Sequence, residues 1–379
     1  MRVVILTHSY PRWPGDSSGA ALAALARALV RRGNAVRVLA PSEEPSGNAE
    51  LDGVSVHRVR VANSLGPALS DQEGLAPGPR GSLGWRTLVR LWRALKSTAR
   101  REVAAGVDVV HAHWWIPAGL ATPSGTPLVL TVHGADAAIL RSSRIARALA
   151  RPLFRRAAVV TAVSRQAGES VQNLAGRHVG SEHIHAMPID SRGHPWTRGG
   201  GGGVLIGRLD TAGRVDLAIE TVAVLASCGH DLPLTIIGDG PDRIALQQRA
   251  QRLGVAALVR FLGAVPADQA RSHLARADFM LFTAQGESNA VTALEALITG
   301  VPVVACWDSG AAVDIVPQSG AGRLSLPSAE ALADSVLSLQ ADTDRLAVGR
   351  LVGEAWRSRL APDHVAQLCE GWYRDALAR

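Results

Sequence analysis

Short β-branched runs alternate with stretches of helical periodicity along the whole chain of 379 residues. Residues 20–32 show the helical pattern, because Leu22, Leu25 and Leu29 recur at a helical spacing and Gly33 then ends the helix. Such alternation predicts parallel sheets built from strand–helix–strand units, so the expected fold class is α/β. Strands are expected at 2–7, 36–39, 54–61, 107–112, 127–132 and 158–162, and then at 204–206, 234–237, 259–262, 279–282 and 301–305.

Two segments interrupt this pattern. Residues 63–84 are rich in Gly, Pro and Ser and are predicted to form a long surface loop. Residues 191–203 end in five consecutive glycines, which predicts a flexible joint. We therefore expect two doubly wound, Rossmann-like domains that face each other across a ligand-binding cleft. Their expected bounds are 1–190 and 204–362, with a linker at 191–203 and a closing helix at 363–379.

Composition narrows the class of protein. A chain with 47% hydrophobic and 19% charged residues can bury a large core and is not disordered. The three cysteines are widely spaced, which argues against a disulfide framework or a zinc knuckle and favours a reducing cytoplasm. The first apolar run is too short for a signal sequence, and no run approaches the roughly 20 apolar residues that cross a bilayer. A soluble or peripheral protein is expected.

Positive charge is concentrated in the first half. Residues 1–190 hold 23 Lys and Arg against 13 Asp and Glu, a balance of +10, whereas 191–379 hold 17 against 20, a balance of −3. A basic half favours an anionic partner or surface. Nucleic acid is the alternative, but no helix-turn-helix, RNA-recognition or zinc motif accompanies the charge, so no nucleic acid partner is expected.

The strongest chemical signal is the segment E-S-N-A-V-T-A-L-E at 287–295, which follows the expected strand at 279–282. A helix that opens near residue 289 would point free backbone N–H groups at an anion such as a diphosphate. Those groups belong to Ser288, Asn289, Ala290 and Val291. Glu287 precedes the helix and Glu295 lies about two turns inside it, so one carboxylate can meet a sugar and the other a ribose. The alternative is that both are solvated surface charges.

This segment resembles the E-x7-E element of the retaining family 4 glycosyltransferases of GT-B fold, also called glycosyl transferases group 1. Further motifs follow in the family's order over nearly the whole chain. They are the glycine-containing loop at 9–19, D-V-V-H-A-H-W at 108–114, T-V-H-G-A-D at 131–136, G-R-L at 207–209, I-I-G-D-G-P at 236–241 and F-L-G at 261–263. The resemblance implies a hexosyltransferase-like enzyme of carbohydrate or secondary-metabolite biosynthesis. It would move a sugar from a nucleotide-diphosphate donor to an unidentified acceptor, with retention of anomeric configuration.

The resemblance also implies roles for single residues. Arg208 would clamp the donor phosphates with its planar guanidinium, and Glu295 would accept hydrogen bonds from the ribose. Glu287 and His133 would be the catalytic residues, Glu287 at the hydroxyls of the transferred sugar and His133 near its reacting carbon. The alternative for His133 is a core histidine at the end of a buried strand.

Two further sets of donor contacts follow from the same resemblance. Gly15 and Gly19 would let backbone N–H groups approach the donor, unless they form a plain surface turn. The nucleobase would lie against the strand at 259–262, where Arg260 and Leu262 are the candidates. The helix at 363–379 would cross back to the first domain.

One departure from the family concerns the charge that meets the leaving group. Where the family usually has a lysine, this chain has Gly213 followed by Arg214, and Lys96, the one lysine, belongs to the first half. Either Arg214 supplies the second charge, or the activity is weak or absent, or the loop is rearranged. The rival functions are a silent protein that binds a nucleotide sugar, and an epimerase or phosphorylase of the same fold class.

No cofactor and no metal ion are expected. The spacing of Asp342 and Asp344 suits a metal, but they lie away from every motif and are interpreted as surface charge. His111 and His113 are predicted to point to opposite faces of their strand, which argues against a two-histidine metal site. Arginine and helix amides can hold a diphosphate instead. In the family's scheme the departing phosphate takes the acceptor's proton, so no protein nucleophile is required.

The acceptor, a small molecule, a glycan or a lipid-linked sugar, is expected to dock on the basic first domain. Residues 85–100 form a cationic amphipathic pattern that includes Trp85 and Trp92. This pattern suits peripheral contact with an anionic membrane, which would place a cytoplasmic protein at the inner face of the membrane. The alternative is a core-packing helix with a solvated basic face.

Overall fold

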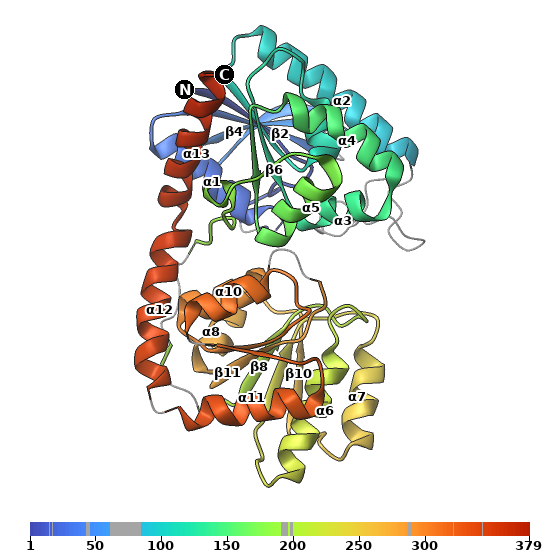
Figure 1. Cartoon of the computed structure of the whole chain (residues 1–379), viewed down its shortest axis with the longest axis vertical. Coiled ribbons are helices and arrows are strands. Elements are labelled where there is room, and N and C mark those ends of the chain that lie inside the picture. Colours follow the sequence, from blue (N-terminus) through green and yellow to red (C-terminus); the bar gives the residue numbers. More distant parts are fainter. Residues whose placement is uncertain are drawn as a thin grey trace. The chain divides into compact units, whose positions relative to one another are not determined.

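The computed structural model describes residues 1–14, 16, 18–42, 46–60, 85–190, 196–197, 200–286, 290–320, 322–342 and 344–379. The chain divides into two compact units, one made of Met1–Asp190 with Leu360–Arg379 and the other of Ser191–Arg359. Each unit is a largely parallel sheet with helices packed on it (Figure 1). The predicted fold class, α/β with two Rossmann-like domains, is confirmed.

The first unit contains a seven-stranded sheet in the order β3-β4-β2-β1-β5-β6-β7. Its strands are β1 (Arg2–Leu6), β2 (Ala35–Ser42), β3 (Gly47–Leu51), β4 (Val54–Arg60), β5 (Val109–His113), β6 (Leu128–Val132) and β7 (Val159–Ala162). All neighbours are parallel except β3 and β4. The central strands are buried along almost their whole length, as continuous apolar runs predict.

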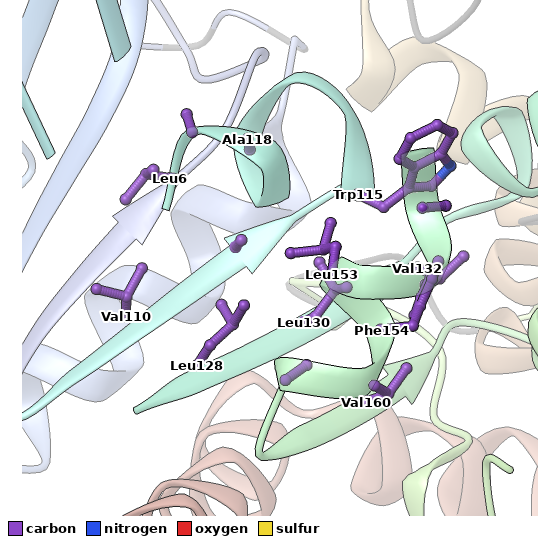
Figure 2. Packing of buried hydrophobic residues seen from close by; sticks show 14 of the residues in the cluster. Leu6, Val110, Trp115, Ala118, Leu128, Leu130, Val132, Leu153, Phe154 and Val160 are labelled. Carbon is purple, nitrogen blue, oxygen red and sulfur yellow. The ribbon is translucent and has the colours of Figure 1, made fainter. Parts of the chain in front are cut away.

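Helices cover both faces of this sheet. They are α1 (Ala20–Arg31), α2 (Trp85–Ala104), α3 (Gly134–Ser142), α4 (Arg144–Arg156), α5 (Arg165–Ala175) and α13 (Pro362–Leu377), with the short elements η2 (Trp115–Gly119) and η3 (Ser181–His183). One core joins β5 and β6 to Phe154 of α4 (Figure 2). The same core includes Leu91 of α2. The other core joins the opposite face to α1 and α13. The C-terminal helix is therefore part of the first unit, where Glu370 accepts from Arg32 at 2.8 Å.

The second unit contains a six-stranded, fully parallel sheet in the order β10-β9-β8-β11-β12-β13. Its strands are β8 (Gly203–Ile206), β9 (Leu234–Ile237), β10 (Val259–Gly263), β11 (Phe279–Phe282), β12 (Val303–Cys306) and β13 (Arg323–Ser325). Its helices are α6 (Val215–Ser227), α7 (Arg243–Arg252), α8 (Ala267–Arg276), α9 (Val291–Thr299), α10 (Ala312–Ser319), α11 (Ala329–Ala341) and α12 (Arg345–Leu360). The direction of strand addition reverses between β8 and β11 here, and between β1 and β5 in the first unit, and ligands of such sheets bind at these reversal points.

The structure differs from the sequence prediction at two strands. β3 was not predicted because its sequence G-N-A-E-L is mostly exposed and pairs only at the sheet edge. β13 was not predicted because it has only three residues. The predicted surface loop at 63–84 lies outside the described residues.

The described part of the predicted joint is held in place. Trp196 is buried and donates from Nε1 to the carbonyl oxygen of Ala277 at 2.8 Å. The backbone N–H groups of Gly200 and Gly202 each donate to the carboxylate of Asp278 at 2.9 Å, and β8 begins at Gly203. A Cβ atom on Gly203 would come within 2.7 Å of the Phe279 ring. Close packing therefore explains why Gly201, Gly202 and Gly203 lack side chains, whereas a Cβ atom on Gly200 would meet no atom within 4 Å. The flexibility of the whole run stays a prediction.

Candidate functional site

In the second unit, the motif residues gather at the carboxyl edge of the sheet, around the reversal point between β8 and β11. The loop after β8 and the turn after β9 are in contact, since Leu209 N donates to the carbonyl oxygen of Asp239 at 3.1 Å. A Cβ atom on Gly238, whose φ is 135°, would overlap the carbonyl oxygen of Gly207. The glycine of the G-D-G-P turn therefore permits this approach of two backbones, which no other residue would allow.

Arg208 is an exposed cation at this edge. Its side chain is 52% exposed, and its guanidinium lies 3.1 Å from the carboxylate of Asp210. Asp210 also accepts from the N–H of Gly213 at 3.0 Å, which closes the loop. Because solvent screens the Arg208–Asp210 pair, an anionic ligand can compete for this guanidinium.

The side chain of Arg214 is more buried than that of Arg208. It lies at the N-cap of α6 with φ 45° and ψ 45°, and its side chain is only 18% exposed. The guanidinium forms a bidentate pair with Asp308 at 2.8 and 2.6 Å, and Nε donates to the carbonyl oxygen of Thr283 at 2.7 Å. Arg214 therefore joins the loop after β8 to the segments after β11 and β12.

Gly213 has no room for a side chain. Its carbonyl oxygen accepts from the Thr283 hydroxyl at 2.9 Å, and a Cβ atom on it would overlap the carbonyl oxygen of Arg208. The loop conformation seen here therefore excludes a lysine at position 213. The cation that directly follows this position is Arg214, whose charge is met by Asp308.

The described part of the E-x7-E element begins at Ala290, a buried residue at the N-cap of α9 with φ 41° and ψ 41°. Helix α9 starts at Val291, slightly later than predicted. Glu287, Ser288 and Asn289 lie outside the described residues. The segment just before them is held to the neighbouring loops, because Gly286 N donates to the carbonyl oxygen of Asp308 at 2.8 Å.

Glu295 lies inside α9 with a side chain that is 21% exposed. Burial raises the pKa of its carboxyl, and the guanidinium of Arg271 on α8, 3.6 Å away, acts in the opposite direction. Glu295 is therefore a half-buried acceptor with one cationic neighbour, not a solvated surface charge. The nucleobase candidates lie on the outer strand β10, where Arg260 is exposed and Leu262 is half-buried.

In the first unit, aromatic rings cluster at the carboxyl ends of β1, β5 and β6. His133, directly after β6, has its Nε2 atom 3.0 Å from Nδ1 of His113. Trp114 stacks on the His133 ring with centroids 4.0 Å apart and an angle of 16°. The His8 ring meets Trp114 edge-on, also at 4.0 Å. All four side chains are buried, so the orientation of His133 is fixed by its neighbours.

Burial keeps these histidines neutral. It lowers the pKa of His133 and His8 to about 3, and that of His113 well below its ordinary value. His111 belongs to the same group, with its pKa also lowered to about 3 by burial and its two nitrogens bonded to Tyr373 and Thr131 at 2.8 and 2.7 Å. At physiological pH, His133 can therefore offer a neutral hydrogen bond but not a positive charge.

The prediction that His111 and His113 point to opposite faces was wrong. Their ring centroids lie 4.4 Å apart. Side chains two residues apart on a strand share a face, because the side-chain period of a strand is two. Even so, no group of three metal-ligating side chains occurs in the part of the chain that the structure describes.

Asp136 anchors the loop that presents this cluster. It is fully buried, and one carboxylate oxygen accepts from the backbone N–H of Trp115 at 2.9 Å. The indole N–H of Trp115 donates in return to the carbonyl oxygen of Asp136 at 2.8 Å. Burial raises the pKa of Asp136 to about 8, so the neutral acid predominates at neutral pH.

Gly19 is required by the fold of its own loop. It has φ 67° at the N-cap of α1, and a Cβ atom on it would lie 2.7 Å from the carbonyl oxygen of Ser9. This close approach is to the chain itself, so it explains the glycine without a ligand. Gly15 lies outside the described residues.

The described part of α2 packs into the core. Leu91, Leu95 and Ala99 are fully buried, and Trp92 donates from Nε1 to the carbonyl oxygen of Leu120 at 3.0 Å. Arg93 and Arg100 face solvent. This arrangement matches the alternative interpretation of residues 85–100, a core-packing helix with a basic outer face; the side chain of Trp85 lies outside the described residues.

Both units match profiles of one enzyme family. Residues 19–188 match Glycosyltransferase Family 4, and residues 203–342 match Glycosyl transferases group 1. The chain belongs to glycosyltransferase family 4. Among curated relatives, it is 29% identical over 231 residues to a GDP-mannose-dependent α-(1-6)-phosphatidylinositol monomannoside mannosyltransferase of Mycolicibacterium smegmatis, a match that covers 56% of this chain and 60% of the relative. It is 25% identical over 313 residues to a 2-deoxystreptamine glucosyltransferase of Streptomyces kanamyceticus, covering 74% and 80%.

Solved structures support the GT-B fold of this glycosyltransferase. A sucrose-phosphate synthase from Thermosynechococcus elongatus superposes with a TM-score of 0.69 at 18% identity, over 99% of each chain. HepE from Anabaena, solved in complex with UDP and glucose, superposes with a TM-score of 0.65 at 19% identity, over 98% of this chain and 99% of its own. The relatives are described as transferases and synthases, which does not favour a silent binding protein.

The glycosyltransferase contains site residues that sequence reasoning did not single out. Asp308 follows β12 at the carboxyl edge of the sheet, so the rule that ligand-binding residues follow strands could have found it. Asp136 belongs to the T-V-H-G-A-D motif but was given no role. Arg271 lies on α8 outside every motif, and no sequence signal marks it. No described helix of the glycosyltransferase combines the length and apolar character that a membrane span requires.

Proposed function

We propose that this glycosyltransferase transfers a sugar from a nucleotide-diphosphate donor to a hydroxyl of a small-molecule, glycan or lipid-linked acceptor. The proposal includes retention of anomeric configuration and no requirement for a metal ion. The observation that carries it is the pair of guanidinium groups, Arg208 and Arg214, at the reversal point of the second sheet, where an anionic ligand would bind.

The diphosphate is proposed to bind between Arg208, Arg214 and the N-terminus of α9. An arginine has five N–H donors, and Arg214 uses three of them for Thr283 and Asp308. Two remain for phosphate oxygens, so Arg214 can serve as the second cation while it stays paired. The guanidinium groups and the helix amides would together stabilise the charge that develops as the diphosphate departs.

The sugar is proposed to contact His133 and Glu287. His133 is neutral and fixed by Trp114 and His113, so it can donate or accept one aligned hydrogen bond. Buried polar atoms nearby, including Nδ1 of His8 and Nε2 of His113, have no hydrogen-bond partner within the described residues. A ligand rich in hydroxyl groups would satisfy such atoms, which supports a sugar site in this region.

The proposed reaction needs no protein nucleophile. The bond between the anomeric carbon and the diphosphate oxygen breaks, and the acceptor oxygen forms its bond on the same face of the sugar. The departing phosphate oxygen takes the acceptor's proton, so the products are the glycoside and the protonated diphosphate. Glu295 is proposed to accept from the ribose, and Arg260 and Leu262 to contact the base.

A two-stage experiment tests this function. Thermal-shift measurements with UDP, GDP and ADP would first identify the base, because a ligand that binds only the folded state raises Tm. The corresponding nucleotide sugars, with and without EDTA, would then be assayed for nucleotide release, and NMR of the product would give its anomeric configuration. We expect one of the three nucleoside diphosphates to raise Tm, and EDTA to leave the rate of nucleotide release unchanged. The product is expected to retain the anomeric configuration of the donor. Binding without release would contradict transfer, and inversion would contradict the proposed geometry.

A further inference from the structure

Helix α4 belongs to the first unit (Figure 1). It has apolar residues on two of its sides. On its inner side, Leu153 and Phe154 pack against the sheet, together with Ala146 and Ala150 (Figure 2). On its outer side, Ile145 is 74% exposed and Leu149 is 49% exposed. A surface helix of a globular protein normally keeps its outer side polar, so these aliphatic side chains need an explanation.

The exposed aliphatic residues form a stripe. Ile145, Leu149 and Pro152 follow one another at spacings of four and three, which puts them on one side of a helix. Ala148, between them, is also exposed, as is Pro152. In α2, by contrast, the leucines whose side chains the structure describes, Leu91 and Leu95, are buried in the core. Among the described residues of the first unit, α4 therefore has two exposed large aliphatic side chains side by side, while Trp13 and Leu377 are exposed singly elsewhere.

Positive charge borders this stripe, and the surrounding sequence holds no opposite charge. No Asp or Glu occurs between Asp136 and Glu169, while this interval holds seven arginines. Arg144, Arg151 and Arg155 are exposed on α4, and none forms an ion pair with a carboxylate in the described chain. Arg151 and Arg155, four residues apart, repel one another, and an anionic partner would relieve this repulsion.

We propose that the outer side of α4 docks on the surface of an anionic lipid bilayer. The helix lies in the plane of the interface, with Ile145 and Leu149 in the boundary between headgroups and acyl chains. Arg144, Arg151 and Arg155 bind lipid phosphates. A lipid surface fits better than a nucleic acid, because the phosphate backbone of a nucleic acid offers no apolar region in which the aliphatic stripe could be buried. The proposal is independent of the proposed function, since it concerns where the protein binds and not what it transfers.

Vesicle co-sedimentation of the full chain tests the proposal. Wild-type protein is expected to pellet with vesicles that contain phosphatidylglycerol, to remain in solution with pure phosphatidylcholine, and to be released by high salt. Two variants test the aliphatic stripe and the arginines of α4 separately. The first is Ile145→Ser/Leu149→Ser, and the second is Arg144→Gln/Arg151→Gln/Arg155→Gln. Each is expected to bind anionic vesicles at least tenfold more weakly than the wild type.

Matched controls separate α4 from general effects of charge and hydrophobicity. The aliphatic control is Ile244→Ser on α7, a side chain that is 70% exposed. The charge control removes three exposed arginines of α2, as Arg90→Gln/Arg93→Gln/Arg100→Gln. Both controls are expected to bind like the wild type, and an unchanged Tm establishes that every variant is folded.

Three results would overturn the proposal. The first is a wild type that does not bind anionic vesicles, whether or not it binds DNA. The second is an α4 variant that binds as well as the wild type. The third is an α2 control that loses binding as strongly as the arginine variant of α4, because net charge would then explain the interaction. These results would leave the proposed function untouched, because nucleotide binding is measured in a separate experiment.

Discussion

Arg214 and Asp308 form a bidentate ion pair at the carboxyl edge of the second sheet, with N–O distances of 2.8 and 2.6 Å. The two residues are 94 positions apart and follow different strands, so the pair fixes the relative position of two loops. The same guanidinium is our proposed substitute for the lysine that the family usually has. We infer that Asp308 both orients Arg214 and partly neutralises the charge that a diphosphate would meet.

Substitution of this pair is expected to change nucleotide affinity in opposite directions. Arg214→Ala should weaken binding of the stabilising nucleoside diphosphate by at least tenfold, because a charge-assisted hydrogen bond contributes about 1.5–3 kcal/mol. Asp308→Asn should strengthen binding several-fold, because it removes the charge that partly neutralises Arg214. Titration calorimetry measures both, and Arg252→Ala on α7 is the control. Equal affinities in all four proteins would show that Arg214 does not contact the ligand.

Restoring the family's lysine is expected to fail. Gly213→Lys should lower the free energy of unfolding by about 1–3 kcal/mol, since a Cβ atom at this position overlaps the carbonyl oxygen of Arg208. Gly213→Ala should lower the free energy of unfolding by nearly as much, because the Cβ atom itself causes the overlap. Gly207→Ala is the matched control, because nothing lies within 4 Å of a Cβ atom there. A stable and more active Gly213→Lys enzyme would contradict this account of the loop.

The catalytic assignments predict large losses of activity. Ala variants of His133, Glu287 and Arg208 should each reduce the transfer rate about 100-fold, as loss of an aligned hydrogen-bonding or charged group does. His230→Ala, an exposed histidine beyond α6, is the control and should be fully active. The kcat and KM values of each variant are measured with the preferred donor. Rates like those of the wild type in all three site variants would refute the assignments.

The neutral histidine cluster predicts loss of stability in acid. His8, His111 and His133 have pKa values near 3 when folded and about 6.5 when unfolded. Between these values the unfolded chain binds more protons, so stability falls as the pH is lowered from 6.5 towards 3, by up to about 1.4 kcal/mol per pH unit for each histidine. Asp136, with a folded pKa of about 8, acts in the opposite direction.

Urea denaturation at pH 7, 5 and 4 measures this dependence, followed through the tryptophans of the first unit. His8→Gln should reduce the slope, because one fewer proton is taken up on unfolding. His230→Gln should not change it, since that side chain is exposed. A wild-type stability that stays constant from pH 7 to pH 4 would contradict the burial of neutral histidines.

The strands could be predicted where apolar runs are continuous. β9 and β11, at Leu234–Ile237 and Phe279–Phe282, begin and end where the sequence predicted them. Edge strands such as β3 could not be predicted, because solvent exposure leaves no apolar run. The crowding of Gly201, Gly202 and Gly203 could not be predicted, because the sequence does not distinguish a glycine with open space around it from one that is crowded by its neighbours.

Of the candidate site, only the residues that belong to sequence motifs could be predicted. Arg208 and Arg214 were predicted from the resemblance to the family's G-R-L motif and the lysine position that follows it, and the structure places both at the carboxyl edge of the second sheet. The pairing of Arg214 with Asp308, and the stacking of Trp114 on His133, depend on contacts between distant segments. No local pattern encodes such contacts, so they required the three-dimensional structure.

The most direct test of the proposed function is a crystal structure of the enzyme soaked with the nucleoside diphosphate that stabilises it. The account predicts the diphosphate at the N-terminus of α9, with guanidinium N–H groups of Arg208 and Arg214 within hydrogen-bonding distance of its oxygens. A diphosphate bound elsewhere, with Arg214 contacting only Asp308 and Thr283, would contradict it.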